Sequence, residues 1–163
     1  EYAISAVHKA SRPGVSAGRT RDDSLAKVKS KGNPFAHLIL RGTDSGPNYD
    51  AEHVAEATHL LASKSLPERV VIDCSHGNSR KDYRQQPAVF ESVVGQMPAN
   101  PAIKGAMLEV YINEGTQAKD IPEDVTGFDR RTLHQGLSVT DACISLDTFK
   151  RLVNDAYKTL KHS

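Results

Sequence analysis

The sequence has little cysteine, no excess charge of either sign and no long apolar run. Its 163 residues include two cysteines, Cys74 and Cys143, a count that gives no disulfide framework and fits a reducing compartment. The formal net charge of +1 gives no overall attraction to nucleic acid or to a membrane surface. No apolar stretch approaches the ~20 residues of a membrane span, and the opening EYAISAVHKAS is too polar for a secretory signal. We therefore expect a cytoplasmic protein that binds neither nucleic acid nor membranes.

Two regions of different composition are present. Residues 1–10 carry apolar residues at helical spacing, and residues 11–33 hold six Lys or Arg against two Asp, with few large apolar side chains. Such a composition is typical of an exposed, mobile connection. Residues 34–163 carry the regular hydrophobic patterning, and their length is sufficient for a domain with its own core. The sequence thus predicts an N-terminal helix and connection over 1–33, followed by the main domain.

Short apolar segments alternate with helical patterns along the main domain. The predicted strands cover residues 35–40, 70–74, 103–111 and 137–144. The predicted helices cover residues 50–64, 79–96 and 146–161, with Asp50 as an N-cap and Pro87 as a point of interruption. Alternation of this kind, with continuous apolar strands, predicts an α/β fold with a parallel sheet covered by helices.

Polar side chains gather where the predicted strands end. Arg41 follows the first strand, His76 the second, Glu109 lies near the end of the third, and Asp141 near the end of the fourth. Function in parallel α/β folds collects at this edge of the sheet. One imidazole with two carboxylates suits Mn²⁺, Fe²⁺, Co²⁺ or Zn²⁺. Arg41 would hold the phosphate or carboxylate of a small anionic substrate.

Each of these residues also has a purely structural interpretation. A histidine after a strand is often only a hydrogen-bonded group, and carboxylates cap helices or pair with lysines. Arg41 alone could form a surface ion pair, and the two cysteines are best read as small buried hydrophobes. Only the set, with one member at each strand end, favours the functional interpretation.

Five motifs in order resemble one enzyme family. They are HLILRG (37–42), NYD (48–50), IDCSHGNS (72–79), INEG (112–115) and SVTDAC (138–143). Together they resemble the class I 3-deoxy-D-arabino-heptulosonate 7-phosphate (DAHP) synthases, and most closely the microbial type that is sensitive to aromatic amino acids. The resemblance runs from about residue 32 to the end of the chain.

The resemblance implies a fold, a reaction and a set of site residues. Members of the family fold as a (β/α)8 TIM barrel and condense phosphoenolpyruvate with erythrose 4-phosphate at the entrance to the shikimate pathway. A cysteine, a histidine, a glutamate and an aspartate hold a divalent metal. By motif, the last three fall on His76, Glu109 and Asp141, and the arginine that contacts phosphoenolpyruvate falls on Arg41. We thus expect His76 and Arg41 to be catalytic residues.

The sequence departs from the family in what it does not contain. It matches only the second half of the barrel, so we expect a half-barrel. The motif with the metal-binding cysteine and the Lys-Pro-Arg motif for erythrose 4-phosphate are absent. Arg21 stands, by alignment, at a lysine that touches phosphoenolpyruvate, which makes it a candidate for substrate binding.

Three interpretations of the missing half remain open. The chain is one piece of a longer or two-chain synthase, or a truncated paralogue with another aldol-like or cyclisation reaction in specialised metabolism, or a non-catalytic regulatory or scaffold module. A half-barrel exposes the apolar core of the missing half. We therefore expect a homodimer, or a partner chain that completes the barrel.

Overall fold

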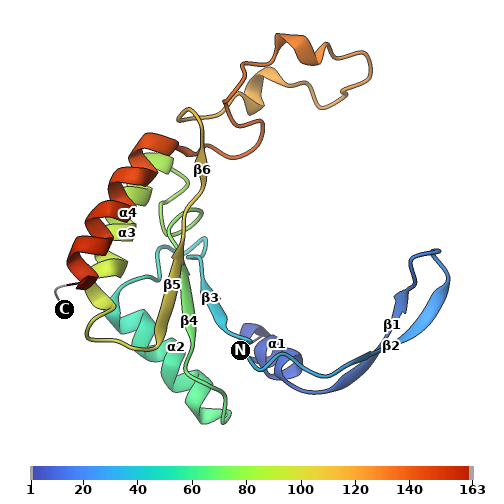
Figure 1. Ribbon diagram of the computed structural model, residues 1–163, viewed down its shortest axis with the longest axis vertical. Helices are drawn as coiled ribbons and strands as arrows, with labels where there is room; N and C mark the ends of the chain where they lie inside the picture. The colour runs from blue at the N-terminus through green and yellow to red at the C-terminus, as the bar shows by residue number, and fades with distance from the viewer. Residues whose placement is uncertain (1, 162–163) are drawn as a thin grey trace.

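The computed structural model describes residues 2–161 and is built around a three-stranded parallel sheet (Figure 1). The strands are β3 (Leu38–Leu40), β4 (Val70–Asp73) and β5 (Ile103–Met107), in the order β3-β4-β5. Leu38 pairs with Val70 and Ile72 with Ala106, in parallel register on both sides of β4. The predicted α/β fold with parallel strands is therefore confirmed.

Helices cover one side of this sheet and bury its apolar residues. They are α2 (Ala51–Ser63) and α3 (Gln86–Gln96), with α4 (Leu146–Lys161) packed along α3 (Figure 1). Val54 and Leu61 of α2 are fully buried with Val70 and Ile72 of β4 in the main core. Asp50 caps α2 as predicted, because its carboxylate accepts hydrogen bonds from the backbone N–H groups of Glu52 and His53.

The helix predicted over residues 79–96 begins later than expected. A short 3₁₀ turn, η1 (Tyr83–Gln85), precedes α3. The chain cannot enter a helix sooner because Arg80 and Lys81 both have positive φ angles, of 53° and 62°. Pro87 lies in the first turn of α3, where its missing N–H costs no helical hydrogen bond, so the predicted interruption there is wrong.

The predicted third and fourth strands are shorter in the structure. The third is split into β5 and β6 (Val110–Tyr111), and the fourth contributes only β7 (Ile144–Ser145), which pairs in parallel with β6. Most of the strand predicted over 137–144 is loop, because it packs on another loop rather than in the sheet: the backbones of Gly115 and Cys143 exchange hydrogen bonds. The long connection also contains the 3₁₀ turns η2 (Ala118–Asp120) and η3 (Arg130–Thr132).

The N-terminal region contains a helix and a hairpin. In α1 (Tyr2–Ser11), Ile4 and Val7 are buried in the main core. An antiparallel hairpin of β1 (Gly14–Arg19) and β2 (Leu25–Ser30) then extends away from the sheet (Figure 1). The sequence pattern did not predict these strands, since their large apolar side chains are few. Two of those side chains, Val15 and Leu25, are 60% and 81% exposed. Among residues 2–161, no helix has both the length and the apolar character of a membrane span.

Candidate metal and anion site

The buried carboxylate of Asp73 contacts Nδ1 of His76. His76 follows β4 directly, and its backbone φ of 50° lies in the left-handed region. Its Nδ1 lies 2.9 Å from Asp73 Oδ2 and 2.7 Å from Ser75 Oγ. Asp73 and Ser75 are themselves buried, and the Ser75 hydroxyl donates to Asp73 Oδ1 at 2.6 Å. Because a carboxylate can only accept, it favours the tautomer with the proton on Nδ1, which leaves the lone pair on Nε2.

Glu109 lies at the break between β5 and β6, and a buried glutamine fixes its backbone. The Glu109 N–H donates to Gln86 Oε1 at 2.8 Å. Gln86 is fully buried in the first turn of α3, and its Nε2 has no hydrogen-bond partner among the described residues. Sequence reasoning missed Gln86, although a glutamine on the apolar face of a helix is a detectable signal.

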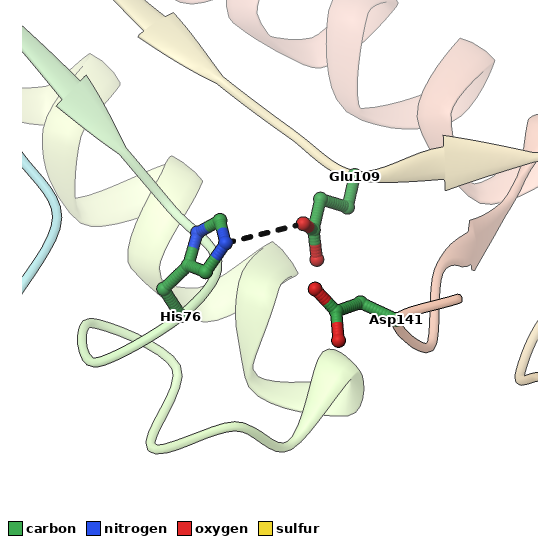
Figure 2. A group of neighbouring side chains, drawn as sticks. All are labelled: His76, Glu109 and Asp141. Carbon is green, nitrogen blue, oxygen red and sulfur yellow. Dashed lines mark ion pairs between the residues drawn. The ribbon is translucent and has the colours of Figure 1, made fainter. Parts of the chain in front are cut away.

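The three predicted ligands come together, as Figure 2 shows. His76, Glu109 and Asp141 each offer one ligand atom, and these atoms lie within 4.8 Å of one another. His76 Nε2 is 3.5 Å from Glu109 Oε1. Burial raises the pKa of Glu109; His76 and Arg41 oppose this rise, and the carboxylates of Asp141 and Asp73 add to it. A divalent cation at this point would relieve the repulsion between Glu109 and Asp141.

The donor set fits a transition-metal ion. One imidazole nitrogen and two carboxylates suit Mn²⁺, Fe²⁺, Co²⁺ or Zn²⁺, and three protein donors leave coordination positions for water or substrate. The group contains no cysteine. Cys74 is fully buried in the core, and burial raises the pKa of its thiol to about 12. Cys143 is half-buried, and burial also raises the pKa of its thiol.

Arg41 joins this group and Arg21 does not. A cavity of about 370 Å³ is lined by the three candidate ligands and by Arg41, Ser79, Lys81, Tyr83, Gln86 and Ala142. We call it the metal cavity. Arg21 is exposed in the turn between β1 and β2 and does not line it. Residues 14–30 form a projecting hairpin instead of a strand of the sheet, and a role of Arg21 in substrate binding stays a prediction.

A buried asparagine joins the two loops that carry Arg41 and His76. Asn78 donates from Nδ2 to the carbonyl oxygens of Leu40 and Asp73, at 3.1 and 2.8 Å, and accepts from the N–H of Asn48 at 2.7 Å. The backbones of Gly42 and Gly77 are in direct contact, so a Cβ atom on Gly42 would lie 2.4 Å from the carbonyl carbon of Gly77. The positions of Arg41 and His76 are thus fixed relative to one another.

The comparisons with known proteins give one family. The model of the DAHP synthetase I family matches residues 1–154. The tyrosine-inhibited phospho-2-dehydro-3-deoxyheptonate aldolase of Schizosaccharomyces pombe is 39% identical over 160 residues, which are 98% of this chain and 42% of that protein. The Tyr-sensitive aldolase of Escherichia coli is 40% identical over 159 residues, or 97% of this chain and 42% of that protein.

A solved structure supports the same relationship. The phospho-2-dehydro-3-deoxyheptonate aldolase of Francisella tularensis superposes with a TM-score of 0.86 at 32% identity, over 97% of this chain and 44% of that one. The chain therefore spans less than half the length of these three relatives. The family match includes residues 1–31, which precede the region where the five motifs resemble the family. On its sequence and its fold, this chain belongs to the DAHP synthetase I family.

Proposed function

We propose that the chain supplies the metal-binding half of a DAHP synthase, which condenses phosphoenolpyruvate with erythrose 4-phosphate in the shikimate pathway. The observation that carries the proposal is the convergence of His76, Glu109 and Asp141 in one cavity that Arg41 also lines. The chain's membership of the DAHP synthetase I family supports the same reaction, because its relatives are phospho-2-dehydro-3-deoxyheptonate aldolases.

The residues of the metal cavity have separate roles in this proposal. A divalent metal, when bound, would polarise a substrate carbonyl as a Lewis acid. His76 would present Nε2 to it while Asp73 holds the Nδ1 proton, and Glu109 and Asp141 would supply oxygen ligands. Arg41 would hold the anionic group of phosphoenolpyruvate with its planar donors. Water or a nearby acid–base group would carry the protons.

We also propose that the chain forms a half-barrel that works with a second chain. The chain matches less than half of each relative's length, and its main sheet has three parallel strands. Both observations support a half-barrel. The Lys-Pro-Arg motif for erythrose 4-phosphate must then come from elsewhere, either from another segment or from a partner. A cytoplasmic location remains the expectation from the cysteine count.

A reconstitution assay tests this proposal. The purified chain is mixed with metal, phosphoenolpyruvate and erythrose 4-phosphate, with and without a separately expressed first half of the S. pombe relative, and phosphate release is followed. We expect no release by the chain alone, release in the mixture, and loss of that release with His76→Ala. If the folded, metal-loaded mixture releases no phosphate, the proposed reaction is contradicted and a repurposed or non-catalytic chain becomes the better account.

A further inference from the structure

One buried polar group beside the candidate metal ligands has no partner. Gln86, in the first turn of α3, is fully buried, and it lines the metal cavity together with the three candidate ligands. Its Nε2 carries two N–H donors and forms no hydrogen bond within residues 2–161. A buried donor without an acceptor costs free energy, so native proteins nearly always supply one. The Gln86 amide is therefore suited to an acceptor that enters the metal cavity.

Contacts with the backbone fix the orientation of this amide. The Glu109 N–H donates to Gln86 Oε1 at 2.8 Å, and the Glu109 carbonyl accepts from the N–H of Ile144 at 3.0 Å. Because a backbone N–H can only donate, the amide atom that faces it must be the oxygen. The Gln86 N–H donates to the carbonyl of Tyr83, which holds the backbone end of the side chain in place. Turning the amide over would therefore break its hydrogen bond with Glu109.

The acidic side chains of the metal cavity do not accept from this amide. Glu109 and Asp141 line the cavity beside Gln86, yet neither carboxylate forms a hydrogen bond with its Nε2. Both carboxylates are candidate metal ligands, and a bound cation would engage their oxygen atoms. The cavity volume of about 370 Å³ leaves room for water or for a small organic molecule. An oxygen that enters with the cation is thus the remaining acceptor.

We infer that Nε2 of Gln86 donates a hydrogen bond to an oxygen atom that binds in the metal cavity together with the cation. The oxygen belongs either to water or to a substrate carboxylate. Gln86 then has two functions: its Oε1 holds the backbone of Glu109, and its Nε2 contacts the ligand. The inference rests on the proposed metal site, and it adds to that site a residue to which the proposed function gives no role.

The side-chain NH₂ signals of Gln86 test this hydrogen bond by NMR in the full chain. They are assigned by through-bond correlation to the Gln86 backbone. Zn²⁺ is the probe metal, since it suits the donor set and is diamagnetic, and oxalate is the probe carboxylate. We expect one NH₂ proton signal to move downfield. It should move with Zn²⁺ alone if the acceptor is water, and only after oxalate is added if the acceptor is a carboxylate.

The outcomes separate this inference from the proposed function. If the chain binds Zn²⁺ but the Gln86 signals move with neither probe, the inference is wrong and the proposed metal site stands. A purely structural Gln86 gives this result, even where Gln86→Met lowers the affinity for Zn²⁺. If the wild-type chain binds no Zn²⁺, the metal site is contradicted and the inference is overturned with it.

Oxalate affinities then separate a hydrogen bond from an effect of charge. Gln96→Met is the matched control, because Gln96 lies in the same helix and has one unpartnered amide atom but does not line the metal cavity. If the signal moves only with oxalate, Zn²⁺-loaded Gln86→Met should bind oxalate about tenfold more weakly than the wild type. Gln96→Met should bind it like the wild type. Equal oxalate affinities of Gln86→Met and wild type would assign the shift to the charge of oxalate and overturn the inference.

Discussion

At the residue scale, the orientation of the His76 ring decides which of its nitrogens can bind a metal. Asp73 accepts the Nδ1 proton, so Nε2 faces Glu109 with its lone pair. Partners of this kind set the tautomer and raise the basicity of a metal-binding histidine. The candidate ligands themselves could be predicted because each lies at or near the end of a predicted strand, although Asp141 is in the loop before β7 in the structure. The roles of Asp73 and Asn78 could not be predicted, since they depend on contacts between segments distant in the sequence or on one hydrogen-bond geometry.

Replacing Asp73 by asparagine should reverse the tautomer. An amide nitrogen in place of Oδ2 donates, so Nδ1 must accept and the proton moves to Nε2. We expect Asp73→Asn to weaken Mn²⁺ binding by about tenfold to a hundredfold, as measured by calorimetry, with the tautomer read from ¹⁵N shifts of His76. Ser75→Ala, which leaves the carboxylate in place, should have a smaller effect. An Asp73→Asn chain that is folded and binds Mn²⁺ like the wild type would refute this role.

The raised pKa of Glu109 predicts a pH dependence of stability in the metal-free chain. Because burial raises this pKa above 4.5, the folded state holds the proton at a pH where the unfolded state has released it. The contribution of Glu109 to folding stability should therefore increase as pH falls from the raised value toward 4.5, and decrease as pH rises through the raised value. Thermal unfolding in chelator should show this trend as a difference between wild type and Glu109→Gln. A difference that does not vary with pH, or varies in the opposite direction, argues against it.

At the scale of elements, the site depends on the contact between the loops after β3 and β4. Gly42 has a φ of 75°, and a Cβ there would lie 2.4 Å from Gly77 and 2.5 Å from Asn78 backbone atoms. Helices α2 and α4 were predicted almost to the residue, since their periodicity and the Asp50 cap are local signals. The hairpin was not predicted because its strands carry few large apolar side chains. Strand β7 was predicted only as the end of a longer strand, because two residues carry no periodicity that separates them from loop.

A pair of glycine substitutions tests the loop contact. Gly42→Ala should destabilise the chain by about 2–4 kcal/mol, since it combines a steric clash with an unfavourable φ. Gly95→Ala in α3 is the matched control, because a Cβ there meets nothing within 4 Å, and it should stabilise the chain by about 0.5–1 kcal/mol. Urea unfolding of both variants gives the two values. Similar stability of Gly42→Ala and wild type would show that the loops are not in contact as described.

At the scale of the whole molecule, apolar surface is left without cover. On α4, Val153, Tyr157 and Leu160 are 43%, 64% and 42% exposed, although they continue the apolar stripe that buries Leu152. Ile39 of β3, at the outer edge of the sheet, is 44% exposed. An open strand edge and an uncovered apolar helix face favour association with another chain.

We therefore expect self-association of the isolated chain. Sedimentation velocity at micromolar concentration should give a species heavier than the 17.7 kDa monomer. Tyr157→Lys should shift the population toward monomer, because it places a charge on the uncovered face of α4. A compact, stable monomer across this concentration range would count against an association built on these surfaces.

The metal site is the central claim, and Mn²⁺ binding tests it most directly. Calorimetry and electron paramagnetic resonance on the full chain should show about one Mn²⁺ per chain, with hyperfine coupling to one imidazole nitrogen. The coupling should disappear in His76→Ala, and the affinity should fall with it, whereas His53→Ala, at an exposed histidine on α2, should change neither. Equal Mn²⁺ binding by wild type and His76→Ala, with no nitrogen coupling in either, would contradict the assignment of His76, Glu109 and Asp141 as a metal site.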